Sequence, residues 1–301
     1  MKSTVILGGT SGYHLAYKVS RILGVELGDI EVKAFPDGET YIRVIPDVRD
    51  KTVVYINSLQ YNPNERIIET LYTLDTLRDL GASRVIAVIP YLAYARQDER
   101  FNPGEAVSIR ILAKLFKSIQ VDAIYTIDTH LHRISDPTEL FGARFYNLTG
   151  VRELARYVRE KQSLENTVIV GPDEEAEQWA KIMAEELGGV EYGVLEKKRL
   201  SPTEVVIEAK GINVRDKNVI IVDDIISTGG TIVEAVKSLR KLGARDITVT
   251  CVHPLLVGTA YQKLLQLDLK DLACTDTVLN PVSKVTVAPV IASEVKNKFF
   301  N

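Results

Sequence analysis

Residues 219–235 read VIIVDDIISTGGTIVEA and carry the clearest structural signal in the chain. An apolar, β-branched run typical of a buried strand ends in the acidic pair Asp223 and Asp224, and STGGT at 227–231 then opens a segment with helical apolar spacing. Glycines let the backbone wrap closely around a ligand, and the free N–H groups at a helix start suit a phosphate. Because paired carboxylates can accept hydrogen bonds from sugar hydroxyls, the stretch predicts a sugar-phosphate site.

A simpler interpretation of this stretch is a glycine-rich turn with a threonine N-cap and two solvated aspartates. The preceding hydrophobic strand and the paired acids favour the ligand site over that turn. The residues predicted to hold the sugar phosphate are Asp223, Asp224, Ser227, Thr228, Gly229, Gly230 and Thr231.

The same alternation of apolar strands and longer amphipathic segments runs along the whole chain. The strand-like runs lie at 4–7, 52–56, 85–89, 123–127, 167–170, 219–222 and 247–252, and the helix-like segments at 65–80, 108–116, 150–162, 174–187 and 231–242. Continuous apolar strands between helices are typical of parallel sheets covered on both faces, so we expect an α/β fold.

An internal repeat indicates that this fold occurs twice. VRDKTV at 48–53 recurs as VRDKNV at 214–219, and LRDLGA at 77–82 recurs as LRKLGA at 239–244. Two such pairs in the same order predict duplicated α/β domains, which we divide into residues 1–146 and 147–301. In the first half the loop corresponding to STGGT is INSLQYNPNERIIET, without the acidic pair or the glycines, so we expect one sugar-phosphate site per chain.

Composition excludes several classes of protein. The chain has 301 residues, is 46% hydrophobic, and has a net charge of −3, which gives no support to bulk binding of nucleic acid or membrane surfaces. Two cysteines cannot form a disulfide framework, and no stretch approaches the roughly 20 apolar residues of a membrane span. We therefore expect a cytoplasmic protein.

Four further segments carry chemistry-bearing residues. They are FPDGE at 35–39, PYLAYARQDE at 90–99, DTH at 128–130 and EKKR at 196–199. The STGGT stretch is similar to the phosphoribosyl-pyrophosphate loop of the type I phosphoribosyltransferase fold. Together with the four segments it resembles the ribose-phosphate pyrophosphokinase family, over about residues 8–295. The resemblance implies two phosphoribosyltransferase-like domains, transfer of the pyrophosphoryl group of Mg²⁺-ATP to ribose 5-phosphate, and a homo-oligomer.

The first two segments are predicted to bind ATP. The Phe35 ring offers a face for adenine, and Asp37 and Glu39, on either side of Gly38, can accept hydrogen bonds from its amino group. The alternative is an ordinary turn with a core phenylalanine. The resemblance implies that this segment reaches into a neighbouring subunit's ATP site. The pair Arg96 and Gln97 follows a strand end, where Arg can grip phosphate oxygens, although a surface ion pair of Arg96 with Asp98 or Glu99 is equally open.

Two metal positions come from the resemblance. It implies that His130 binds Mg²⁺ and the ATP phosphates and that Asp173 belongs to a second Mg²⁺ site. Histidine is an unusual ligand for hard Mg²⁺, so Asp128 is a candidate outer-sphere partner. The family often has glycines after this aspartate, whereas this chain has Glu174 and Glu175. His132 receives no role.

The basic segment is the candidate catalytic element. Fixed cations stabilise the charge that develops on the β-phosphate oxygens and the leaving AMP. By resemblance Lys197 and Arg199 take this role, Arg199 also contacting ribose 5-phosphate. On a strand, residues 197 and 199 share one face and Lys198 points outward. The alternative is a solvated basic run.

Two other functions stay open at this point. One is a phosphoribosyltransferase, which would have a single domain, and the other is a non-catalytic regulatory homologue. The family's phosphate-activated members carry a basic loop after YARQD, but residues 99–105 here have one arginine and two acids. We therefore expect weak or absent control by phosphate and ADP.

Overall fold

The computed structural model describes residues 4–131, 133–134, 136–201 and 204–299, and for 197–207 it describes the backbone only where it is in a strand. The chain divides into two compact units. Unit 1 contains Met1–Thr149 and Val287–Asn301, and unit 2 contains Gly150–Thr286. Both are built from parallel strands and helices, as the alternating sequence pattern predicts.

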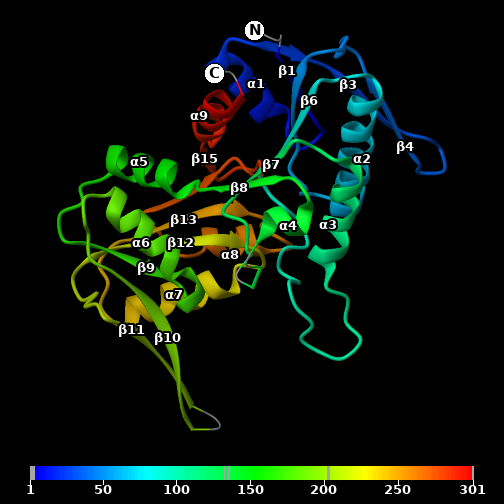
Figure 1. Cartoon of the computed structure of the whole chain (residues 1–301). Coiled ribbons are helices and arrows are strands. Elements are labelled where there is room, and N and C mark those ends of the chain that lie inside the picture. Colours follow the sequence, from blue (N-terminus) through cyan, green and yellow to red (C-terminus); the bar gives the residue numbers. More distant parts are fainter. Residues whose placement is uncertain (1–3, 132, 135, 202–203, 300–301) are drawn as a thin grey trace. The chain divides into compact units, whose positions relative to one another are not determined.

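Unit 1 is a parallel sheet in the order β2-β1-β5-β6-β7-β8, with helices on both faces and a separate hairpin, β3–β4 (Figure 1). Its elements are β1 (Thr4–Gly8), α1 (Tyr13–Leu23), β2 (Glu26–Gly28), β3 (Ile30–Ala34), β4 (Thr40–Val44), β5 (Thr52–Ile56), α2 (Pro63–Asp79), β6 (Arg84–Ile89), α3 (Ser108–Ile119), β7 (Ala123–Ile127), α4 (Pro137–Phe141), β8 (Arg144–Leu148) and α9 (Ala288–Phe299). All five residues of β5 and of β7 are buried, as expected for strands covered on both faces.

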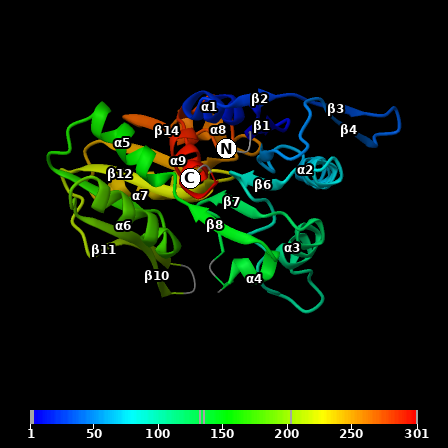
Figure 2. The same ribbon diagram turned by 45° about the horizontal axis from the view of Figure 1, so that its top comes forward.

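The last helix explains why unit 1 is discontinuous in sequence. The sequence predicts two continuous halves, 1–146 and 147–301, whereas in the structure the final segment belongs to unit 1. Helix α9 packs against α1 through Ile291 and Val295, which are fully buried, and Figures 1 and 2 show the two helices side by side. The apolar face of α9 is therefore buried against a helix from the opposite end of the sequence.

Unit 2 has seven strands in the order β11-β10-β9-β12-β13-β14-β15, of which only the β10–β11 pair is antiparallel. Its elements are α5 (Val151–Lys161), β9 (Thr167–Gly171), the 3-10 helix η1 (Glu174–Ala176), α6 (Glu177–Glu186), β10 (Tyr192–Ser201), β11 (Glu204–Lys210), β12 (Asn218–Ile226), α7 (Gly230–Lys241), β13 (Ile247–Pro254), α8 (Ala260–Leu265), β14 (Asp271–Thr275) and β15 (Ser283–Val285).

The sequence repeat occupies equivalent places in the two units. Each VRDK copy leads into the strand that precedes the first helix of the repeat, β5 in unit 1 and β12 in unit 2. Each LR-LGA copy ends that helix and leads into the next strand, β6 or β13. The predicted duplication of one α/β domain is confirmed.

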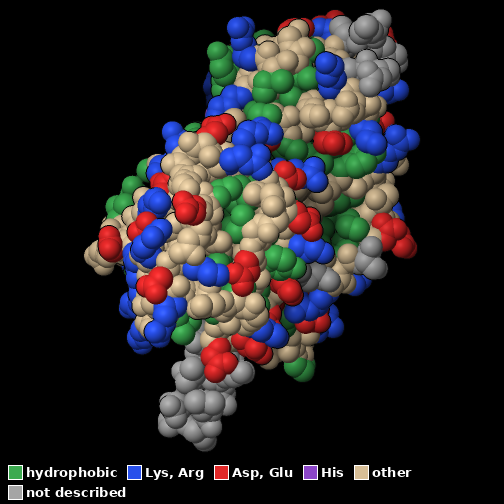
Figure 3. Space-filling model, turned by 90° about the vertical axis from the view of Figure 1, so that its left-hand side faces the viewer, with side chains coloured by type: hydrophobic (Ala, Val, Ile, Leu, Met, Phe, Trp, Pro, Cys, Tyr) green, Lys and Arg blue, Asp and Glu red, His purple; other side chains and the backbone are tan. Residues whose placement is uncertain are grey.

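The distribution of charge on the surface and the character of the helices agree with the composition. On the face shown in Figure 3, basic and acidic side chains are interspersed, consistent with the small net charge of −3. Among the described residues no helix has the length and apolar character needed to cross a membrane.

Candidate active site

The acidic pair and the glycine loop of unit 2 form a pre-shaped anion site. Asp223 and Asp224 lie near the carboxyl end of the central strand β12 and are only 8% and 5% exposed. Gly229 precedes α7 with φ +77°, a left-handed conformation that glycine adopts without strain. No side chain caps α7, so its first N–H groups stay available to a ligand. The simpler interpretation, a threonine N-cap with solvated aspartates, is wrong on both points.

The carboxyl group of Asp223 is buried beside other carboxyl groups. Burial raises its pKa well above the ordinary aspartate value, and the neighbouring charges of Asp224 and Asp173 raise it further. The Asp224 N–H donates to Oδ1 of Asp223 over 3.0 Å, which partly offsets this effect. A group of carboxylates held together in this way is stabilised by hydroxyl donors or by a cation.

Asp173 follows β9 and begins the short helix η1. The N–H of Ala176 donates to its Oδ1 at 3.2 Å, so Asp173 caps the turn formed by Glu174 and its neighbours. Burial raises the pKa of Asp173, and the charges of Glu175 and Asp224 add to this shift. The departure from the glycine pattern therefore produces a capped 3-10 turn, and it leaves Asp173 close to the β12 acids.

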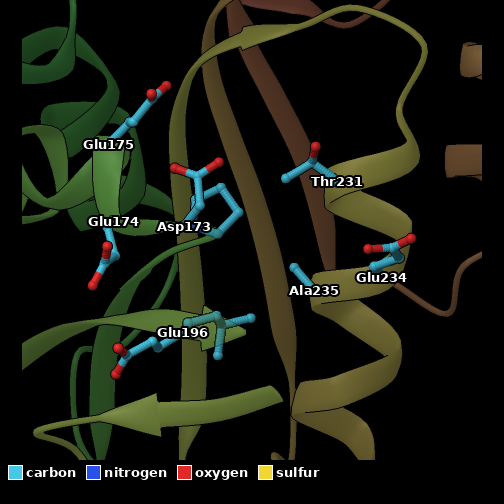
Figure 4. Close-up of a pocket in the computed structure, with 9 residues that line it drawn as sticks. Asp173, Glu174, Glu175, Glu196, Thr231, Glu234 and Ala235 are labelled. Carbon is cyan, nitrogen blue, oxygen red and sulfur yellow. The ribbon is translucent and has the colours of Figure 1, made fainter. Parts of the chain in front are cut away.

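Asp173 and Thr231 line one pocket of about 490 Å³ within unit 2. In Figure 4 Asp173 projects from the loop after β9, and Thr231 faces it from the first turn of α7. The lining residues are Pro172, Asp173, Glu174, Glu175, Leu195, Glu196, Thr231, Glu234 and Ala235. The structure thus brings the predicted metal residue next to the predicted phosphate loop.

The basic segment lies on a two-stranded arm. Among the described residues, strand β10 pairs with β9 over residues 192–194, and beyond this point its partner is β11. Lys197 is opposite Ile207 and Arg199 is opposite Val205, so the two positions are two residues apart on one strand and lie on the same face of β10. The side chains of Lys197 and Arg199 lie outside the described part of the structure. At the base of the arm, Lys210 Nζ lies 3.3 Å from Glu174 and 3.7 Å from Glu196.

In unit 1, the FPDGE segment forms the tip of the β3–β4 hairpin. Gly38 has φ +93°, the Gly38 N–H donates to the Phe35 carbonyl at 2.8 Å, and the Phe35 N–H donates to the Glu39 carbonyl at 2.8 Å. The Phe35 ring is 49% exposed and meets Tyr41 edge to face, with ring centroids 5.9 Å apart. The alternative of a core phenylalanine is therefore wrong, because Phe35 is exposed. Figure 1 shows the β3–β4 hairpin, which carries it, projecting from the sheet.

Arg96 is available for a ligand because Arg133 pairs with the acids that follow it. Arg133 was not among the residues predicted from the sequence. Asp98 and Glu99, its candidate partners, instead pair with Arg133, whose nitrogens lie 3.0 Å and 2.9 Å from their carboxylate oxygens. Arg96 is exposed and makes no ion pair with any described residue. Gln97 donates to Glu105 at 3.3 Å, which ties it to the following loop. A lone arginine in a loop gives no periodic signal, so only tertiary contact reveals Arg133.

His130 follows a strained turn at the end of β7. Asp128 is 6% exposed and has φ +35°, a conformation that is costly for a residue with a Cβ. The Thr149 hydroxyl donates to Asp128 Oδ2 at 3.2 Å, and the Thr129 N–H donates to Asn147 at 2.9 Å. His130 itself is half-buried beyond this turn. His132 lies outside the described residues.

The equivalent loop of unit 1 has buried, uncharged side chains where unit 2 has the acidic pair. Asn57 and Ser58 occupy the positions that Asp223 and Asp224 have in the repeat, and both are buried. The carboxylate of Glu69 accepts the Thr10 N–H at 2.7 Å and is 2.5 Å from Arg66. An internal carboxylate therefore takes up a backbone donor of the glycine-rich loop after β1.

Comparison with known proteins gives consistent matches along the chain. A family model described as the N-terminal domain of ribose phosphate pyrophosphokinase matches residues 4–119, and one described as a phosphoribosyl transferase domain matches residues 145–280. A ribose-phosphate pyrophosphokinase of Methanopyrus kandleri is 42% identical over 295 residues, covering 97% of this chain and 99% of that protein. One from Methanothermobacter thermautotrophicus is 39% identical over 293 residues, covering 97% and 100%.

Solved structures agree with the sequence matches. A phosphoribosylpyrophosphate synthetase from Mycobacterium smegmatis has a TM-score of 0.88 with this chain at 28% identity, and the match covers 100% of both chains. The chain has two units of the phosphoribosyltransferase type. One of them has a buried acid pair and a helix that begins after a glycine without a side-chain cap. These features define a class of proteins that act on phosphoribosyl groups. Within that class, this chain belongs to the ribose-phosphate pyrophosphokinase family. The single-domain phosphoribosyltransferase alternative is excluded by the N-terminal family domain.

Proposed function

We propose that this chain transfers the pyrophosphoryl group of Mg²⁺-ATP to ribose 5-phosphate, giving 5-phosphoribosyl 1-pyrophosphate and AMP for nucleotide biosynthesis. The anomeric hydroxyl attacks the β-phosphorus in line, and AMP is the leaving group. No covalent enzyme intermediate is required, so catalysis comes from positioning and from neutralisation of charge.

The observation that carries this proposal is the buried acid pair beside an uncapped helix start in unit 2. Asp223 and Asp224 accept hydrogen bonds from the ribose 2- and 3-hydroxyls, which replaces an unfavourable buried charge contact with donors. The 5-phosphate binds the first N–H groups of α7 and the hydroxyls of Ser227, Thr228 and Thr231, with Gly229 and Gly230 allowing close approach. Arg199 adds a cation to this group.

ATP is proposed to bind residues of unit 1. Arg96, which has no ion pair among the described residues, holds phosphate oxygens, and Gln97 and His130 add polar contacts. The exposed Phe35 ring stacks on adenine in the site of a neighbouring subunit, with Asp37, Gly38 and Glu39 contacting its edge. This arrangement requires a homo-oligomer, and we place the enzyme in the cytoplasm.

The donor chemistry of unit 2 fits Mg²⁺. The described residues contain no ready-made cluster of three metal-ligating side chains, but Mg²⁺ commonly binds one or two carboxylates together with waters and substrate phosphates. Asp173 supplies such a carboxylate, and its raised pKa indicates that a nearby cation would stabilise its charged form. His130, in unit 1, is the proposed ligand of a separate Mg²⁺. The ion would neutralise the phosphate charge of bound nucleotide.

Lys197 and Arg199 are the proposed catalytic cations. Because they share one face of an arm that leaves the sheet, both can be directed to the same phosphate group. Cations that contact the developing charge on the β-phosphate and the leaving AMP lower the barrier more than they stabilise bound substrate.

The direct experiment is a coupled assay of AMP release from ATP and ribose 5-phosphate with Mg²⁺. We expect AMP to appear only when both substrates are present, and we expect the Asp223→Asn, Asp224→Asn double variant to abolish this ribose 5-phosphate-dependent release of AMP. Circular dichroism of that variant controls for folding. Absence of AMP over a broad Mg²⁺ range would overturn the proposal and leave the regulatory homologue as the better interpretation.

A further inference from the structure

The two cysteines of the chain lie opposite one another inside unit 2. Cys251 is on β13 and Cys274 is on β14, and the two are Cα partners in this parallel pair of strands. They are the only cysteines in the sequence, and Cys274 follows Cys251 by 23 positions. Both side chains are fully buried, and both are free thiols. The fold therefore brings together two sulfur groups that the proposed reaction does not use.

The strand pairing places the two residues at a distance that suits a covalent link. Neighbouring strands lie about 4.8 Å apart, and disulfides commonly join residues whose Cα atoms are about 4.4–6.8 Å apart. Both cysteines belong to one apolar cluster with Ile232 of α7 and Leu264 of α8, so both side chains are on the face of the sheet that these helices cover. The register of β13 and β14 thus meets the distance requirement for a disulfide without a shift of either strand.

Cys251 also adjoins the acid pair. Its Cα partner on the other neighbouring strand, β12, is Asp223, and its thiol donates to the Asp224 carbonyl over 3.4 Å. Burial raises the pKa of Cys251 well above the ordinary thiol value, and the Cys274 thiol beside it raises the pKa further. Since the thiolate is the reactive form, Cys251 is inert at neutral pH while β13 and β14 remain paired.

We propose that Cys251 and Cys274 are a dithiol modification site, which a low-molecular-weight disulfide of the glutathione type converts into an intramolecular disulfide between β13 and β14. One cysteine thiolate attacks a sulfur of the small disulfide, which forms a mixed disulfide and releases one small thiol. The second cysteine thiolate attacks the protein sulfur of the mixed disulfide, and the second small thiol leaves. The two cysteines are oxidised by two electrons, the small disulfide is reduced, and the two protons end on the released thiols.

Burial determines when this bond forms and how long it lasts. The reaction requires a local opening at β14, whose outer neighbour β15 has only three residues. With two cysteines in the chain, no other intramolecular pairing competes. The same core then shields the closed bond from reductants, and the link restricts the unfolded chain, so the oxidised form is the more stable one. In a reducing cytoplasm the pair stays as thiols.

The test uses the full chain in a glutathione redox buffer without substrates, held just below its thermal midpoint so that β14 opens transiently. Mass spectrometry of the intact, acid-quenched chain should show the loss of two hydrogen atoms as the main product, and the midpoint of thermal unfolding should rise by roughly 5 °C. A reductant at the same temperature should reverse both changes. Cys251→Ser and Cys274→Ser are matched controls. Each keeps one thiol, so neither should show the rise in midpoint.

Two results would overturn the proposal. Chains that keep both thiols free under these conditions would show that the pair is only a packed part of the core. Chains that carry glutathione as the main product would show that the two sulfurs do not reach one another. The comparison of oxidised and reduced parental protein stands even where a serine variant folds poorly. Because no substrate is present, these results are independent of whether the proposed reaction occurs.

Discussion

Arg133 Nη1 lies 3.0 Å from Oδ1 of Asp98, whose side chain is fully buried. The same arginine reaches Glu99 at 2.9 Å. These two acids directly follow Arg96 and Gln97, the candidates for ATP binding, and Arg133 forms ion pairs with both. The pairing explains why Arg96 is exposed without an ion pair among the described residues, and it makes Arg133 a positioning residue for the proposed ATP site.

A double-mutant cycle tests this relationship. We expect Arg96→Ala to raise the KM for ATP about 10-fold, because a charge-assisted contact to phosphate is lost. Arg133→Met should raise it several-fold in the parental chain, since Asp98 and Glu99 become free to draw Arg96 away. In the Arg96→Ala background, Arg133→Met should add little. Equal effects in both backgrounds would show that Arg133 does not act through Arg96.

The catalytic arm gives a second prediction. Lys197→Ala should lower kcat roughly 100-fold or more, because a fixed cation is removed from the transition state, with little change in ribose 5-phosphate binding. Lys198→Ala is the matched control, since position 198 is on the other face of the strand from positions 197 and 199 in the backbone register, and it should retain most activity. Calorimetric titration with ribose 5-phosphate separates the two effects. Parallel losses of binding and kcat would assign Lys197 to substrate binding.

The buried acid pair makes stability depend on pH in a defined direction. Because the pKa of Asp223 is raised, the folded protein holds this proton more tightly than the unfolded chain does. The free energy of unfolding should therefore fall as pH rises from the ordinary aspartate range toward neutrality. Asp223→Asn should reduce this slope in urea titrations without Mg²⁺, whereas Asp268→Asn, at a fully exposed position, should leave it unchanged. A steeper slope in the Asp223 variant would contradict the assignment.

Two adjacent glycines of the phosphate loop should respond differently to substitution. Gly229→Ala places a Cβ on a residue at φ +77°, so we expect it to lower the free energy of unfolding by about 1–2 kcal/mol. It should also weaken ribose 5-phosphate binding, since the start of α7 must shift. Gly230 lacks a positive φ, and its added Cβ would come no nearer than 3.9 Å to Thr228, so Gly230→Ala should cost little stability. Thermal unfolding of both variants provides the comparison.

The loop after Gln97 predicts weak control by phosphate. Arg100, its one arginine, donates through Nε to the Glu105 carbonyl at 2.7 Å, and the Glu105 carboxylate accepts the Phe101 and Asn102 N–H groups. Arg100 and the two backbone N–H groups thus all bind Glu105 within the same loop. Activity titrated with inorganic phosphate and with ADP at saturating substrates should show no more than about twofold activation. A larger, saturable activation would place a phosphate site on this loop or elsewhere.

The sequence alone determined the α/β class, the duplication, and the local form of each motif. These follow from contacts close in sequence: apolar runs such as residues 219–222 predict buried strands, and STGGT predicts a helix start whatever the rest of the chain does. Alternation on β10 likewise follows from strand geometry, and it places residues 197 and 199 on one face.

Only the tertiary structure decided which groups meet. Asp173 affects the pKa of Asp223 although 49 residues separate them, because β9 and β12 pair in the sheet. Arg133 takes the partners that were open to Arg96, and α9 returns to α1. Such contacts depend on strand order and chain reversal, for which a single sequence carries no periodic signal. The local sequence pattern determines the helices and strands and the reactive side chains that they carry. Long-range packing determines which charged side chains are paired, which are buried, and which remain available to bind substrate.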